Sequence, residues 1–160
     1  MSKSILKEKN IELIHLYLKE ERLYNNYASY CGLSLSSLRI LYDLYALFKT
    51  DKSYMQSDIA KITSLSKQTV NSSIAGLIKK GYVELEHIEM TRNGKAIKLT
   101  KEGKNLCKKI IEPLIKAEEN SLANMSEKEI DTLIILLNKS ISMLEKELEI
   151  IYKKSKRGDK

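Results

Sequence analysis

The sequence predicts a mainly helical protein with one small β-hairpin. Only one proline, Pro113, and six glycines occur in 160 residues, so few positions interrupt a helix. Apolar residues recur every three or four positions over most of the chain, as expected for helices with one buried face. A single Asn-Gly pair, at 93–94, lies between two short runs of alternating apolar and polar residues, and this pattern predicts a hairpin.

Three helices are predicted before the middle of the chain. The first spans about residues 5–30 and ends at Cys31-Gly32, because glycine is common just past a helix end. Ser34 has the right side chain to cap the second helix, which continues to a polar loop at 50–53. A short third helix, about 55–63, is expected to pack through Ile59, Ala60 and Ile62.

A tight polar turn, with Leu65 as its buried anchor, is predicted to lead into a fourth, longer helix. Ser66 caps this helix, which is expected to end at Lys80, where Gly81 stops it. Four apolar residues form its predicted core stripe, namely Val70, Ile74, Leu77 and Ile78.

The hairpin is predicted from residues 82–88 and 97–99, with a basic tip at 91–95. In its first strand Val83 and Leu85 alternate with glutamates and are expected to share the apolar face. Thr100 caps a fifth helix, in which Pro113 should cause a kink. Ser126 and Glu129 form a capping box that opens the last helix. In this helix apolar residues alternate four and three positions apart from Ile130 to Ile151, which is a heptad pattern.

A short helix, a tight turn, a longer helix and a hairpin, in this order, make a winged helix-turn-helix, whose second helix enters the major groove of DNA. On a helical wheel, polar residues of the fourth helix lie opposite Val70 and Ile74, and Gln and Asn side chains can pair with adenine. The predicted DNA contacts are Ser66, Lys67, Gln68, Thr69, Asn71, Ser72 and Lys79 on this helix, and Arg92, Asn93 and Lys95 at the hairpin tip.

The charge distribution supports a polyanionic partner for this part of the chain. The chain has 28 Lys and Arg against 21 Asp and Glu, a net charge of +7. Residues 52–104 contain ten of the basic and five of the acidic side chains, so this third of the chain carries +5 and the remainder only +2. The excess positive charge therefore lies where contact with phosphate is predicted.

Four stretches resemble the MarR family of transcriptional regulators. Residues 65–70 and 77–83 resemble that family's recognition helix running into its wing, 99–103 its junction after the wing, and Gly32-Leu33-Ser34 the start of its second helix. The resemblance covers about residues 5–152. One departure is Thr91-Arg92-Asn93, because many relatives carry an Asp-x-Arg pair at the wing tip, in which the Asp braces the Arg.

The resemblance implies a regulator, expected to be a repressor, that binds a pseudo-palindromic site on double-stranded DNA as a homodimer. The predicted domains are a helical dimerisation region from 1–34 and 101–155, a winged domain at 35–100, and a basic tail at 156–160. Relatives often bind aromatic anions, and an aromatic effector would contact Tyr24, Tyr27, Tyr42 and Tyr45 in this chain. The sequence favours the alternative interpretation of these tyrosines as core aromatics, since the chain has nine tyrosines but no tryptophan and only one phenylalanine.

Other functions have weaker support in the sequence. A redox-responsive regulator would use Cys31 or Cys107, and winged helices also serve as protein-interaction modules. His15 and His87 have no partners in sequence that would indicate a catalytic or metal site, so neither enzyme activity nor a cofactor is expected. The N-terminus lacks an apolar signal core, and no apolar run approaches about 18 residues, so we expect a cytoplasmic protein without membrane contact.

Overall fold

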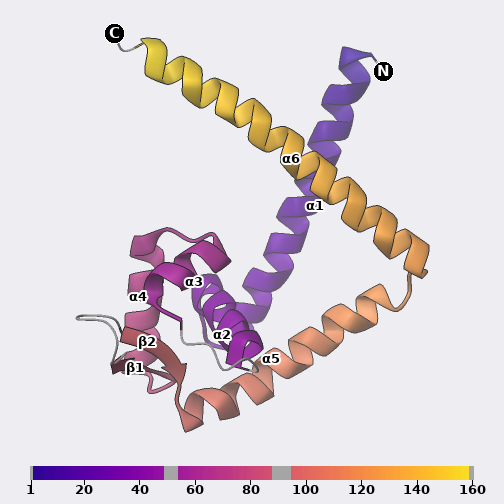
Figure 1. Cartoon of the computed structure of the whole chain (residues 1–160). Coiled ribbons are helices and arrows are strands. Elements are labelled where there is room, and N and C mark those ends of the chain that lie inside the picture. Colours follow the sequence, from indigo (N-terminus) through magenta and orange to yellow (C-terminus); the bar gives the residue numbers. More distant parts are fainter. Residues whose placement is uncertain (1, 49–53, 88–94, 159–160) are drawn as a thin grey trace. The chain divides into compact units, whose positions relative to one another are not determined.

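The computed structural model describes residues 2–48, 54–87 and 95–158, with side-chain surroundings for all of these except 47, 48 and 155–158. The elements in chain order are α1 (Lys3–Tyr30), α2 (Leu35–Phe48), α3 (Gln56–Thr63), α4 (Lys67–Lys79), β1 (Val83–His87), β2 (Lys95–Leu99), α5 (Lys101–Leu122) and α6 (Glu127–Gly158) (Figure 1). The predicted fold class, mainly helical with a small hairpin, is confirmed.

The predicted helix starts are confirmed by their hydrogen bonds. The Ser34 hydroxyl accepts from the Ser37 backbone N–H at 3.1 Å, and the Thr100 hydroxyl accepts from the Gly103 N–H at 2.9 Å. At the start of α6, the Ser126 N–H donates to the Glu129 carboxylate at 2.8 Å. Each bond satisfies a backbone or side-chain group that the first turn of a helix would leave unpaired.

The predicted helix ends are confirmed as well, because glycine adopts a left-handed backbone at both. Gly32 follows α1 with φ +67°, and Gly81 follows α4 with φ +74°. At the far end of the chain α6 continues to Gly158, so most of the predicted basic tail is helical. Lys and Arg are good helix formers, and no glycine or proline precedes Gly158 in this helix.

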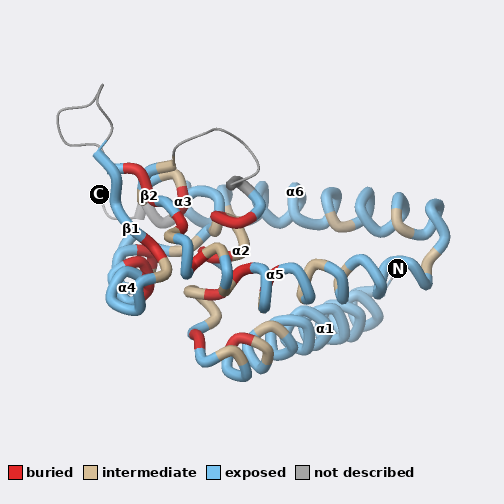
Figure 2. The backbone as a smooth tube through the Cα atoms, turned by 90° about the horizontal axis from the view of Figure 1, so that it is seen from below, coloured by how far each residue is buried: buried red, intermediate tan, exposed pale blue. Residues whose placement is uncertain are grey.

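The core lies among α2, α3, α4 and the hairpin, where the buried segments in Figure 2 concentrate. Ile40, Leu41, Ile59 and Ile74 are fully buried there. Hydroxyl groups join two of the helices, because Ser73 in α4 donates to the Ser36 hydroxyl at 2.8 Å. These contacts hold α4 in a fixed position on the core.

Three residues expected in this core are more exposed than predicted. Ile62 is 45% exposed and Ile78 is 38% exposed, and Leu65 is half-buried. Ile78 lies about 80° around the helix from Val70, at the margin of the face that contacts the core. Because α3 has only two turns, α2 and α4 cover the side of this helix that carries Ile59, and the Ile62 side chain is left partly exposed to solvent.

The hairpin is antiparallel, and its register pairs Val83 with Leu99 and His87 with Lys95. Leu85 was expected to share a buried face with Val83 but is 38% exposed, because β2 packs against α2 and α3 whereas β1 packs against α4. The sequence did not indicate that Tyr54 would join the sheet. Its carbonyl accepts from the Ile97 N–H at 2.8 Å, on the side of β2 opposite β1.

The chain divides into two compact units, Met1–Leu114 and Ile115–Lys160. The boundary falls within α5, one residue after Pro113, which lies inside this helix. Ala28 is the one buried residue of α1, and most of α1 and α6 is exposed in Figure 2. No helix in the described ranges combines the length and apolar content that a membrane span requires.

Candidate nucleic-acid interface

The turn between α3 and α4 holds the two helices of the predicted helix-turn-helix. Ser64 occupies the left-handed region with φ 54°, which a short turn between two helices requires. The Thr63 hydroxyl donates to the Ile59 carbonyl at 2.7 Å and accepts from the Leu65 N–H at 3.4 Å. Ser66 then caps α4 by accepting from the Thr69 N–H at 3.1 Å. Local hydrogen bonds therefore set where α4 begins.

One side of α4 is buried and the opposite side is polar and exposed. Val70 and Ile74 are 0% exposed and Leu77 is 1% exposed. The exposed polar residues on the other side are Lys67, Gln68, Asn71, Ser72 and Lys79, all predicted DNA contacts. A polar face over a buried stripe is what a helix needs if it packs on a domain and also enters a groove.

Three of the predicted DNA contacts at α4 have hydroxyl groups that are already hydrogen-bonded locally, namely Ser66, Thr69 and Ser72. Thr69 is half-buried, and its hydroxyl lies 2.8 Å from that of Ser66. The Ser72 hydroxyl donates to the Thr69 carbonyl at 3.0 Å. A hydroxyl that donates inside the helix can still accept, but it is a weaker candidate for base reading than the amides of Gln68 and Asn71.

The hairpin places Lys95 at its outer end, opposite His87 and exposed. Arg92 and Asn93, the other predicted contacts at the tip, lie outside the described residues. Closer to the core, Lys98 forms an ion pair with Glu86 across the strands. Both partners are about half exposed, so this pair contributes little to stability.

Lys80, another basic residue near the interface, forms a hydrogen bond within the fold. The Lys80 ammonium group donates to the Gly32 carbonyl at 3.0 Å and so connects the end of α4 to the turn between α1 and α2. The carbonyl groups at the end of a helix carry partial negative charge, which a cation stabilises. Lys80 therefore positions α4.

The four tyrosines predicted to contact an effector all lie in the first unit. Tyr24, Tyr27 and Tyr42 are half-buried and Tyr45 is buried. The Tyr27 hydroxyl donates to the Ile110 carbonyl at 2.7 Å, and the Tyr45 hydroxyl donates to the Glu112 carboxylate. Two of the four tyrosines thus attach α1 and α2 to α5.

These contacts affect the ionisation of both phenols. The hydrogen bond to Glu112, together with burial, raises the pKa of Tyr45 to about 12. Burial is the main cause of the raised pKa of Tyr27, and Cys31 adds to it. Sequence reasoning missed Glu112, since its partner lies 67 positions away and no local pattern connects the two.

The two cysteines differ in accessibility. Cys107 is fully buried, and burial raises the pKa of its thiol to about 12, whereas Cys31 is partly exposed at the end of α1. The thiolate is the reactive form, so a rise from 9.0 to about 12 lowers the thiolate fraction of Cys107 at neutral pH on the order of 1,000-fold. Any redox response would therefore have to use Cys31.

Iodoacetamide at neutral pH should alkylate Cys31 in the native protein and leave Cys107 unmodified. Peptide mass spectrometry after brief labelling measures both sites in one sample. Labelling in denaturant is the control, because unfolding should make the two thiols comparably reactive. Equal alkylation of both cysteines in the native protein would contradict the burial of Cys107.

Neither histidine has surroundings that indicate catalysis or metal binding. His15 lies exposed on α1 and His87 lies exposed at the end of β1. Within the described ranges, no three His, Cys, Asp or Glu side chains come close enough together to hold a metal ion.

Comparison with known proteins identifies the same fold in solved structures. A MarR-family regulator from Neisseria meningitidis has a TM-score of 0.69 and 23% identity over 93% of this chain and 98% of that chain. The DNA complex of Staphylococcus aureus MepR gives a TM-score of 0.70 and 20% identity over 85% of this chain and 97% of that chain. The structure of S. aureus MarR in complex with salicylate and kanamycin has a TM-score of 0.68 and 18% identity over 90% of this chain and 95% of that chain.

Sequence comparison points to the same family. Residues 32–92 match the model of the MarR family, and this range contains α2, α3, α4 and β1. Proteins with curated descriptions yield no match. The family match covers the helix-turn-helix region, and solved MarR-family structures share the fold along most of the chain, so this chain is similar to MarR-family regulators in both respects.

Proposed function

We propose that the protein represses transcription by binding a pseudo-palindromic site on double-stranded DNA as a homodimer. The observation that carries this proposal is the division of α4 into a buried face, with Val70 and Ile74, and an exposed polar face. In each copy α4 would lie in the major groove, and the hairpin tip would contact the neighbouring minor groove or backbone. The solved MepR complex with DNA supports the same partner for this chain.

The exposed residues of α4 divide by chemistry into two roles. The amides of Gln68 and Asn71 have a donor and an acceptor each, and such a pair matches the major-groove edge of adenine. Lys67, near the start of the helix, and Lys79, near its end, are suited to phosphate contact, as are Arg92 and Lys95 in the hairpin. Phosphate contacts would supply affinity and base contacts would supply sequence preference.

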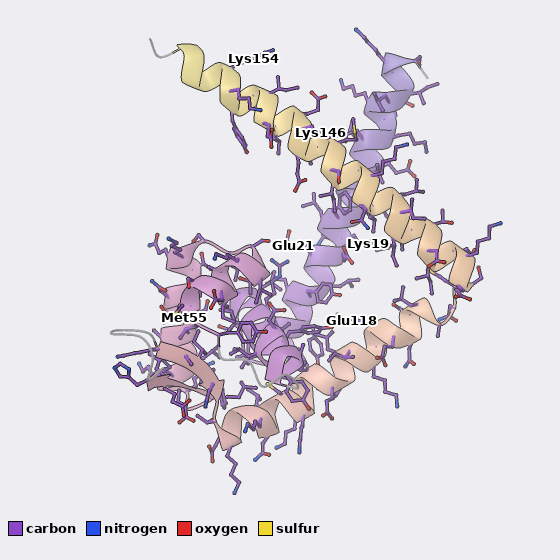
Figure 3. The ribbon with its side chains drawn as sticks, in the orientation of Figure 1. Lys19, Glu21, Met55, Glu118, Lys146 and Lys154 are labelled. Atoms are coloured by element: carbon purple, nitrogen blue, oxygen red, sulfur yellow. The ribbon has the colours of Figure 1, made fainter. Side chains whose placement is uncertain are left out.

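A homodimer would cover the apolar surface that α1 and α6 expose. Leu144 is 59% exposed, Ile141 is 55% exposed and, on α1, Leu16 is 56% exposed. Charged side chains such as Lys19 and Glu21 on α1, or Lys146 and Lys154 on α6, project from the same helices in Figure 3. Both helices therefore combine charged positions with exposed apolar side chains, which form a heptad stripe on α6, and burial of such apolar surface favours association.

An aromatic effector is the second part of the proposal. It would contact Tyr24, Tyr27, Tyr42 and Tyr45, and the structure of S. aureus MarR with salicylate supports this ligand class. The hydroxyls of Tyr27 and Tyr45 hold α5 through Ile110 and Glu112. A ligand that formed a hydrogen bond with either hydroxyl would displace Ile110 or Glu112 and weaken the attachment of α5. This gives a physical route from ligand binding to release of DNA.

Gln68→Ala should change which sequence the protein prefers, whereas Arg92→Ala should weaken binding to every sequence. Loss of one base contact costs about 1–3 kcal/mol at its own base pair, and loss of a phosphate contact has little sequence dependence. Fluorescence anisotropy with a selected site and a scrambled site of equal length measures both effects. Lys139→Gln, at an exposed position of α6 outside the proposed interface, is the control and should leave binding to both duplexes unchanged.

The selected site comes from repeated rounds of binding to a random duplex library. If Gln68→Ala weakens binding to the selected and the scrambled duplex by the same factor, α4 does not read bases through Gln68. If neither duplex binds the wild-type protein, the proposed function itself is wrong.

A further inference from the structure

The start of α5 makes close contact with the turn that joins α4 to β1. The Thr100 hydroxyl donates to the Gly81 carbonyl at 2.7 Å and accepts from the Gly103 N–H at 2.9 Å. The Thr100 N–H donates to the Tyr82 carbonyl at 3.1 Å. Two of these three hydrogen bonds of Thr100 end on the turn between α4 and the hairpin.

Gly103 permits this contact because it has no side chain. A Cβ atom at position 103 would lie 1.9 Å from the Tyr82 carbonyl oxygen and 2.9 Å from its carbonyl carbon, far inside any real contact distance. The obstacle is backbone, which cannot rotate away as a side chain can. Gly103 is buried within α5, so it is the space, and not the backbone conformation, that requires glycine here.

Gly81 and Tyr82 are the only residues between the C-cap of α4 and the start of β1. The same turn is bound to α4 itself, because the Tyr82 N–H donates to the Leu77 carbonyl at 3.0 Å. Any movement of the turn would therefore change the angle between α4 and the hairpin. Contact with Thr100 and Gly103 restricts that movement.

We propose that Thr100 and Gly103 are positioning residues that hold α4 and the hairpin in the one relative orientation in which both contact DNA at once. The inference rests on the proposed function, since it requires that both elements bind DNA. A rigid pair of binding elements loses little conformational freedom when it binds, so their contacts reinforce one another. With the junction loosened, α4 and the hairpin would bind less cooperatively although every DNA-contacting side chain is still present.

Thr100→Val tests the junction, because valine keeps the shape of threonine and removes its hydroxyl. We expect Thr100→Val to lower DNA affinity by about tenfold, given the loss of two hydrogen bonds. Thr100→Ser retains the hydroxyl and should restore affinity to within about twofold of the wild type. Asn105→Ala, at an exposed position of α5, controls for general effects on this helix. Circular dichroism at the assay temperature confirms that each variant is folded.

A double-mutant cycle separates positioning from a general loss of structure. Lys95→Ala removes a predicted hairpin contact, and it should cost clearly less affinity in the Thr100→Val background than in the wild type, because the hairpin is already partly disengaged. Gly103→Ala, measured in the same way, should reproduce the coupling of Thr100→Val. Equal costs of Lys95→Ala in both backgrounds, or wild-type affinity of Gly103→Ala, would overturn the inference.

The cycle also distinguishes failure of the inference from failure of the proposed function. If Lys95→Ala and Gln68→Ala both leave the affinity of the wild-type background unchanged, the assigned DNA contacts are wrong, and the junction has nothing to position. If both weaken the wild type but their costs add to that of Thr100→Val, the DNA contacts stand and the positioning role fails.

Discussion

Replacing Leu144 by aspartate is expected to convert the protein to a monomer and to abolish high-affinity binding to a two-half-site duplex. Leu144 lies in the heptad stripe of α6 and is 59% exposed in the single chain. In a two-fold symmetric interface the substitution occurs twice. Losing a buried leucine costs about 2–5 kcal/mol per copy, so the dimer dissociation constant should rise by a factor on the order of 1,000 or more.

Analytical ultracentrifugation at micromolar concentration measures the change in mass, and anisotropy with one and with two half-sites measures its effect on binding. Ser142→Asp is the matched control, since it introduces the same charge on the exposed, polar side of α6 and should leave the dimer intact. A dimeric Leu144→Asp protein would show that the stripe on α6 is not the interface. A monomeric wild type would contradict the proposed dimer altogether.

DNA affinity is expected to fall steeply as the salt concentration rises. Lys67, Lys79 and Lys95 are exposed at the proposed interface. These three lysines in each of two chains allow six phosphate contacts, and Arg92 would add two more. Six to eight contacts predict a loss of affinity on the order of 1,000-fold or more between about 50 and 200 mM salt, because each contact releases condensed counterions from the duplex.

A variant that lacks one positive charge per chain tests how many phosphate contacts cause this salt dependence. Lys67→Gln removes two contacts per dimer, so the slope of log affinity against log salt should become shallower by about 1.8. Lys139→Gln removes the same charge from α6, outside the proposed interface, and should leave the slope unchanged. A wild-type affinity that hardly changes over this salt range would rule out binding driven by phosphate contacts.

Features that depend on residues close together in the chain were predicted from the sequence. Ser34, Ser66 and Thr100 cap helices as expected, because a hydroxyl and the N–H groups it binds lie within three positions. Gly32 and Gly81 end helices because only glycine adopts a left-handed backbone without steric cost. The periodicity of apolar residues was enough to separate the buried from the polar face of α4.

The arrangement of the interface depended on contacts between distant parts of the chain. The packing of β2 against α2 and α3 buried Ile97 and left Leu85 exposed, although the sequence predicted the same face for Val83 and Leu85. Periodicity likewise assigned Ile62 to the core, where the short α3 does not bury it. The degree to which a residue is covered depends on which elements surround it, and the pattern within its own element does not contain that information.

The sequence by itself determined the order of the elements, their capped ends and the polar face of α4, because each follows from the local chemistry of a few neighbouring residues. Only the tertiary structure decided that Lys80 donates a hydrogen bond to the Gly32 carbonyl and that Tyr45 donates one to Glu112. The same is true of position 103, where only glycine fits against the Tyr82 backbone. These contacts join residues between 21 and 67 positions apart. They form only when folding brings the segments together, so no spacing or composition in the chain encodes them locally.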